Sequence, residues 1–253
     1  ITDKGAGVNM QGGELIAIGQ INLNADGDIT LAGTRLEAES SSINVTADNV
    51  RVKNDDNGNA SRWLSKEDIT VTSKTLTHIS GANIASDKDI TMAQFSTGQG
   101  DILISNSQIE AKRNLALNGQ KIDTANKAVL LSGKYLTLRG EDIKLVDSVL
   151  SSQLTLADND SGYVTISANN LFEIAGGSIN AAHSLKIKAP NITINNAQLA
   201  ALQHISLQDI NSTPSQSQKS QKIAMTNSKV IAAAGDLKLF SESITIDGDY
   251  VTD

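Results

Sequence analysis

The chain has 253 residues, a net charge of −7 at pH 7 and no cysteine, and only 3% of its residues are aromatic. The missing thiols exclude disulfide bridges and cysteine chemistry, and the negative charge argues against a surface for nucleic acid, which needs clustered Lys and Arg. With so few aromatic side chains, a core of this size must be thin and aliphatic, which indicates a narrow, extended molecule.

Pairs of apolar residues separated by one polar residue recur along the chain, and each pair predicts a strand with one buried face. In chain order the pairs lie at residues 29–31, 43–45, 50–52, 69–71, 102–104, 115–117, 136–138, 143–145, 154–156, 164–166, 185–187, 192–194, 205–207, 237–239 and 244–246. Many pairs are about seven residues apart, but the a/d pattern of a coiled coil is missing and Gly, Asn and Asp fill the gaps. The repeat therefore predicts strands and not helices.

Three such steps make a unit of about 20 to 21 residues, a length typical of solenoid repeats. One strand of the unit follows Asp, another follows Asn, and a third follows Gly or another small residue, and these residues favour corners. We therefore expect an all-β fold: a right-handed, single-stranded parallel β-helix with about three strands per coil. Residues 1–253 are expected to form one continuous β-helix segment of a longer chain, with loop excursions near 54–63, 158–163 and 211–221.

Several units resemble the repeats of the filamentous haemagglutinin family, which form the shafts of two-partner-secreted bacterial exoproteins. The resemblance rests on residues 27–33 (GDITLAG) and their echoes, with 12–15 (GGEL) and 176–181 (GGSINA), and it covers nearly the whole chain. The Asn-Pro-Asn-Gly signature of that family's secretion domain is absent, so the chain resembles an internal segment. The resemblance implies a shaft of an adhesin, a haemolysin-like protein or a contact-dependent growth inhibition toxin, secreted to the outside of the outer membrane.

The same resemblance implies particular partners. These are an outer-membrane partner transporter during export and, for the exported protein, a receptor, a glycan or an outer-membrane protein on a target cell. The chain is expected to be a monomeric rod. It has no stretch close to the roughly 20 apolar residues of a transmembrane helix.

The loop excursions are the candidate contact sites, because function on a solenoid is often carried by enlarged corners. The first either presents Trp63 and the acidic residues Asp55 and Asp56 to a partner or is a hairpin whose Trp folds back onto the core. The second is either a weak calcium turn or an ordinary turn, and the third is a flexible excursion or a partner-binding loop. Their candidate contact residues are Asp158, Asp160, Tyr163, Gln216 and Lys219.

No catalytic, metal or cofactor site is predicted. An acidic column of five Asp residues at one corner would suit a polysaccharide-degrading enzyme, but its repetition along the rod favours turn capping: Asp28, Asp68, Asp89, Asp101 and Asp236. The three His residues fit no metal-binding motif, and a stack of His183 on His204 in successive coils is interpreted as a chance alignment. Short basic pairs such as Lys186 with Lys188 are interpreted as solvated strand residues.

Overall fold

The computed structural model describes residues 1–3, 7–95, 100–154, 160–208 and 220–248. In these ranges the chain forms strands and turns, with no helix and hence none able to cross a membrane. The strands divide into sheet A, with 18 strands, and sheet B, with 10. In spatial order sheet B contains β3 (Glu14–Ala17), β6 (Arg35–Ala38), β8 (Ser61–Ser65), β10 (Ala82–Ser86), β13 (Gln108–Ala111), β16 (Val129–Ser132), β18 (Val149–Ser152), β20 (Ser178–Ala181), β23 (Gln198–Ala201) and β26 (Lys229–Ala232).

Sheet A contains the remaining strands. In chain order these are β1 (Thr2–Asp3), β2 (Val8–Gln11), β4 (Ile21–Ala25), β5 (Ile29–Ala32), β7 (Ile43–Lys53), β9 (Ile69–Ser80), β11 (Ile90–Gln94), β12 (Asp101–Ser105), β14 (Asn114–Asn118), β15 (Lys121–Ala125), β17 (Tyr135–Val146), β19 (Tyr163–Ala175), β21 (Leu185–Lys188), β22 (Asn191–Asn195), β24 (Ile205–Gln208), β25 (Ser220–Thr226), β27 (Leu237–Leu239) and β28 (Ser241–Asp247).

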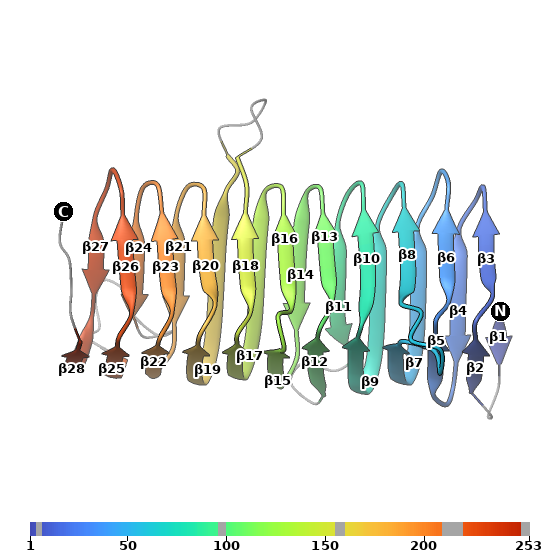
Figure 1. The fold of residues 1–253 in the computed structure, drawn as a ribbon, viewed down its shortest axis with the longest axis horizontal. Coiled ribbons are helices and arrows are strands. Elements are labelled where there is room, and N and C mark those ends of the chain that lie inside the picture. Colours follow the sequence, from blue (N-terminus) through green and yellow to red (C-terminus); the bar gives the residue numbers. More distant parts are fainter. Residues whose placement is uncertain (4–6, 96–99, 155–159, 209–219, 249–253) are drawn as a thin grey trace.

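All pairings are parallel, and the two sheets extend together along the long axis of the molecule (Figure 1). Between one strand of sheet B and the next, the chain passes through sheet A; we call one such passage a layer. β2 pairs with β5, β3 with β6 and β4 with β7, so each layer lies against the one before it. Equivalent residues meet in columns, as in the series Val8, Ile29 and Val50.

Side chains that point between the sheets form one continuous core of buried Ile, Leu, Val and Ala. Every second strand residue contributes, as in β22, where Ile192 and Ile194 are buried and Thr193 between them is only partly buried. The two largest fully buried side chains are Trp63 and Phe172. The core is therefore aliphatic and long, as the low aromatic content predicts.

The corners that lead into sheet B use residues with positive φ, such as Asn106 (φ 46°) and Asn227 (φ 46°). Asn tolerates this left-handed conformation better than most residues with a side chain. A buried hydroxyl follows at several of these corners: Ser107 Oγ donates to the carbonyl of Ser105 (2.7 Å) and accepts from the amide of Ala82 (3.1 Å). These corners thus satisfy backbone groups that neither sheet pairs.

The prediction of a single right-handed β-helix with three separate strands in every coil is wrong. The strands belong to two separate sheets, and β7, β9, β17 and β19 each run continuously through a predicted corner. Within sheet A, the pairings of β9, β11, β14, β17, β15 and β12 form a closed ring of six parallel strands. The physical reason is visible in β7, where a register shift between Ala47 and Asn49 lets the strand bend without ending.

The number of residues in a layer also varies along the chain, unlike in a uniform repeat. Val8 pairs with Ile29, 21 residues further on, whereas Arg35 pairs with Arg62 and Gln198 with Lys229. The extra residues of the longer steps fall between strands, and the pairing of both sheets continues on either side of them. The division of residues 1–253 into one segment with three excursions stays a prediction.

Candidate functional site

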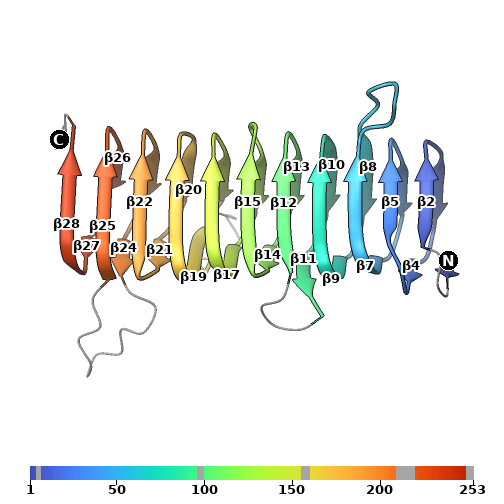
Figure 2. The ribbon, with the colours of Figure 1, turned by 90° about the horizontal axis from the view of Figure 1, so that it is seen from below.

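Residues 54–60, here called the Asp55 loop, stand out from the stack between β7 and β8 (Figure 2). The loop is held by its own polar groups. The carboxylate of Asp55 accepts hydrogen bonds from the backbone amides of Asn57 (2.9 Å) and Asn59 (2.8 Å) and from the side-chain amide of Asn59 (2.8 Å). These donors, the Asn59 side chain first, lower the pKa of Asp55. The loop is therefore shaped in advance of any contact.

The neighbouring layers support the Asp55 loop on both sides. Gln11 donates a hydrogen bond to the Asp56 carboxylate (2.5 Å). On the preceding layer Gly33 lies directly under Asp55, and on the following layer Gly81 lies against the side chain of Asn54. Asp56 remains exposed, so it stays a candidate contact residue, whereas Asp55 is half-buried and acts as the framework of the loop.

Trp63 is not available to a partner. It is 0% exposed and points into the core from β8, where it is in register with Leu36 on one side and Ile84 on the other. The interpretation in which the loop presents Trp63 is therefore wrong, because residue 63 falls on an inward position of a strand. The alternative, a Trp that returns to the core, agrees with this position.

The second excursion ends at a stack of rings from successive layers. Tyr163 stacks on Tyr135, with 5.5 Å between ring centroids, and on His183, with 4.4 Å. The Tyr163 hydroxyl lies 3.4 Å from Nε2 of His183, and Nδ1 of His183 lies 2.9 Å from the hydroxyl of Ser184. His183 thus stacks on Tyr163, a relation that the sequence spacing did not indicate. Both faces of the Tyr163 ring are occupied.

Of the other candidate contact residues in the excursions, the structure describes Asp160 alone. Asp160 is exposed just before Tyr163. Asp158, Gln216 and Lys219 lie outside the described residues.

The Asp residues considered for an acidic column do not share one column. Asp68 and Asp89 lie in successive layers at one corner of sheet A, and the amide of Asp89 donates to Asp68 (3.2 Å). Asp28 precedes β5 and Asp101 is the first residue of β12, and both strands belong to a different part of sheet A from β11 and the start of β9 at the Asp68 corner. Asp28 accepts hydrogen bonds from Asn49 and Arg51 (2.6 Å each). An Asp before a strand caps either corner, so sequence position alone does not align these groups.

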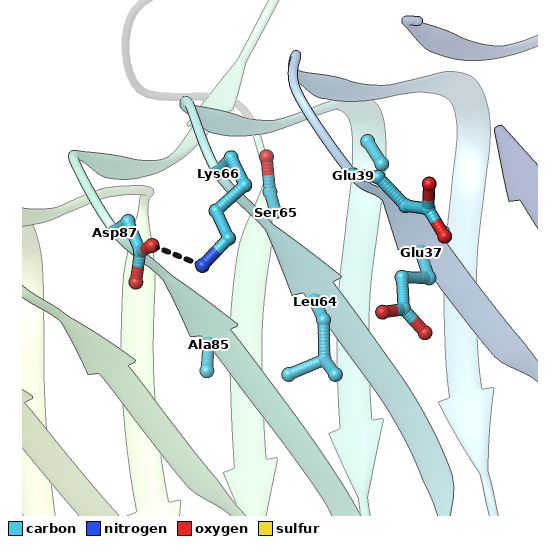
Figure 3. Close-up of a pocket in the computed structure, with 8 residues that line it drawn as sticks. Glu37, Glu39, Leu64, Ser65, Lys66, Ala85 and Asp87 are labelled. Atoms are coloured by element: carbon cyan, nitrogen blue, oxygen red, sulfur yellow. Dashed lines mark hydrogen bonds and ion pairs between the residues drawn. The ribbon is translucent and has the colours of Figure 1, made fainter. Parts of the chain in front are cut away.

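A shallow groove of about 140 Å³ lies on the outer side of sheet B (Figure 3). Leu64 and Ala85 form its floor, Glu37 and Glu39 line one side, and the ion pair of Lys66 with Asp87 (2.9 Å) lines the other. Glu37 is also paired with Arg35 and Asp87 also with Lys112 (2.6 Å). Glycoside hydrolysis uses two cooperating carboxyl groups. In this groove two of the three carboxyl groups are held by cations, which suits a contact surface better than catalysis.

Among the described residues, no group of three or more His, Asp or Glu side chains is arranged to hold a metal ion. No protein-family model, curated protein or solved structure matches the chain. The resemblance to filamentous haemagglutinin repeats therefore rests on the sequence motifs alone.

Proposed function

We propose that the chain is a stiff shaft segment of a secreted bacterial surface protein of the filamentous haemagglutinin kind, and that it contacts target cells through its protruding corners. The observation that carries this proposal is the unbroken ladder of sheet B. Its ten strands, at a spacing of roughly 4.8 Å, correspond to a rod about 43 Å long. Insertions such as the Asp55 loop leave this ladder intact.

A shaft tolerates the loss of one whole layer, whereas a folded catalytic or binding pocket does not. Residues 108–128 provide a clean deletion, because Gln108 pairs with Val129, Asn114 with Tyr135 and Lys121 with Asp142. Removal of all 21 residues joins equivalent positions and keeps every inward residue inward. Removal of only 108–127 shifts the following strands by one residue and turns their core side chains outward.

The experiment measures saturable binding of the purified chain to candidate target cells. The deletion of 108–128 is expected to fold and to bind like the parent, and the deletion of 108–127 is expected to fail to fold. Loss of cell binding by a folded variant that lacks residues 108–128 would contradict the proposal that the chain is a shaft segment.

The contact part of the proposal is tested on the Asp55 loop. Asp56→Ala combined with Asn57→Ala removes two exposed polar side chains and leaves Asp55 in place. Gln108→Ala combined with Glu110→Ala is the matched control, because it removes an exposed amide and an exposed carboxylate from sheet B. Weaker cell binding in the loop variant alone supports contact through this corner. Absence of binding by the folded parent contradicts it.

A further inference from the structure

One face of sheet A carries positive charges that have no ionic partner. In the described part of the chain no ion pair involves Arg139, Lys186 or Lys188, although Lys66, Lys88, Lys112 and Arg113 are all paired with carboxylates. Arg139 and Lys186 are exposed and Lys188 is half-buried. These three residues, which we call the cationic face, come from β17 and β21.

The register places the three cations close together. Arg139 pairs with Ser167, and Ser167 pairs with Lys188, so Arg139 and Lys188 belong to one column two strands apart, at about 10 Å. Thr165 pairs with Lys186, which lies two residues before Lys188 on the same strand. The long side chains of all three can therefore reach a single extended ligand.

Among the described residues, the outward rows of sheet A that surround the cationic face carry no carboxylate. Glu141 and Asp142, which follow Arg139 on β17, accept hydrogen bonds from Asn169 and Asn170 and form no ion pair with the cationic face. The outward residues of β14, β21, β24, residues 135–139 and residues 163–167 include no Asp or Glu. The chain as a whole carries −7, so this face differs in sign from the average surface. Partial desolvation and the nearby charge of Lys188 lower the pKa of Lys186. An anion placed here would relieve the repulsion between the two lysines.

We propose that the cationic face binds an acidic polysaccharide. Carboxylate or sulfate groups along such a chain match cations spaced along a flat sheet, since charge-assisted hydrogen bonds to Lys and Arg are the strongest available at a surface. The hydroxyls of Thr165, Ser167 and Ser206 lie between or beside the cations and can exchange hydrogen bonds with sugar hydroxyls. This inference deepens the proposed contact function and rests on it.

The nearby aromatic residues favour a polysaccharide over a single-stranded nucleic acid. Non-specific binding of bases relies on aromatic rings with a free face. The Tyr163 ring is stacked between Tyr135 and His183, so neither of its faces can receive a base. The overall negative charge also repels a phosphate backbone.

The test compares the intact chain with charge variants on immobilised dextran sulfate and polygalacturonate at low salt. Lys186→Gln with Lys188→Gln is expected to weaken binding about tenfold, which corresponds to about 1.4 kcal/mol for the two lost contacts together. Arg139→Gln weakens it by a smaller factor. The control, Lys66→Gln with Lys112→Gln, changes the net charge by the same amount but removes cations already paired with Asp87. It is expected to bind like the parent.

If the control loses as much polysaccharide binding as the Lys186, Lys188 variant, binding depends on net charge alone and the proposal is overturned. Absence of binding by the folded parent, or equally tight binding to duplex DNA or anionic vesicles, would also overturn it. Cell binding measured on the same variants separates this inference from the contact function. If cells are bound equally by the parent and the Lys186, Lys188 variant, only the cationic face is rejected.

Discussion

The carboxyl group of Asp55 occupies the space into which a side chain on Gly33 would extend: a Cβ atom at Gly33 would fall 2.7 Å from the Cβ of Asp55. Gly33 also has a φ of 60°, which disfavours other residues. We expect Gly33→Ala to lower the free energy of unfolding by about 2–4 kcal/mol, combining backbone strain with overpacking against the loop. Chemical denaturation followed by circular dichroism measures this change.

Gly12 provides the control for that experiment. It lies at the equivalent corner of the preceding layer with a φ of 64°, but nothing lies within 4 Å of its added Cβ. Gly12→Ala should therefore cost only the backbone strain of about 1–2 kcal/mol. Equal losses in the two variants would mean that Asp55 does not press on Gly33.

The hydrogen bonds to Asp55 predict its titration. Because they lower the pKa of Asp55 in the folded chain, its ionised form stabilises the loop above the unfolded value of about 3.9. This contribution is lost as the pH falls through the folded pKa. Asn59→Ala removes the largest cause and should raise the pKa of Asp55 towards 3.9, as measured by the carboxyl carbon shift in NMR.

Asn57→Ala is the matched control for the titration, since Asn57 donates to Asp55 only through its backbone amide. The pKa of Asp55 in this variant should equal that of the parent. A shift as large as that of Asn59→Ala would contradict a specific role for the Asn59 side chain.

The corner hydroxyl of Ser107 predicts a stability effect out of proportion to its size. Ser107 is buried, and its hydroxyl is the hydrogen-bond acceptor of the Ala82 amide. Ser107→Ala leaves that amide without a partner, which costs about 1–3 kcal/mol of unfolding free energy. Ser151→Ala, on the outer side of β18, should change stability by less than about 0.5 kcal/mol. Thermal and urea unfolding of both variants decides whether the hydroxyl has this role.

The indole of Trp63 combines a large buried ring with an Nε1–H that has no hydrogen-bond acceptor within the described structure. Trp63→Phe removes the unsatisfied donor with some loss of area, and the two effects should nearly cancel, within about 1 kcal/mol. Trp63→Ala leaves a cavity and should cost about 3–5 kcal/mol. A Phe variant as unstable as the Ala variant would show that the indole nitrogen is satisfied in solution.

The sequence pattern was sufficient for the local structure and insufficient for the alignment of layers. Alternation identified Ile192 and Ile194 as inward residues because a strand has a period of two. The same pattern failed at Leu154, which lies outside any strand and is 46% exposed; Leu156, the other residue of that pair, lies outside the described residues. The sequence carries no signal that Leu154 follows the end of β18 at Ser152.

The candidate site was harder to predict for the same reason. The stack of Tyr163 on His183 and the placement of Arg139 and Lys188 in one column depend on which residues face each other across layers. That register changes with every insertion between strands, as the longer step from Arg35 to Arg62 shows. Trp63 was ambiguous because the last residues of an excursion and the first of a strand look alike in sequence.

The long strands β7, β9, β17 and β19 give the middle of the rod a different resistance to unravelling from its two extremities. Each of them pairs with two different strands of a neighbouring layer, so the layers from β7 to β19 cannot open at one of these pairings without disturbing the other. In a stack held by nearest neighbours, opening otherwise starts wherever a layer has a neighbour on one side only. Amide protons of the strands from β7 to β19 would then exchange last, and a molecule stretched along its axis would keep this central block folded while the outer layers peel away.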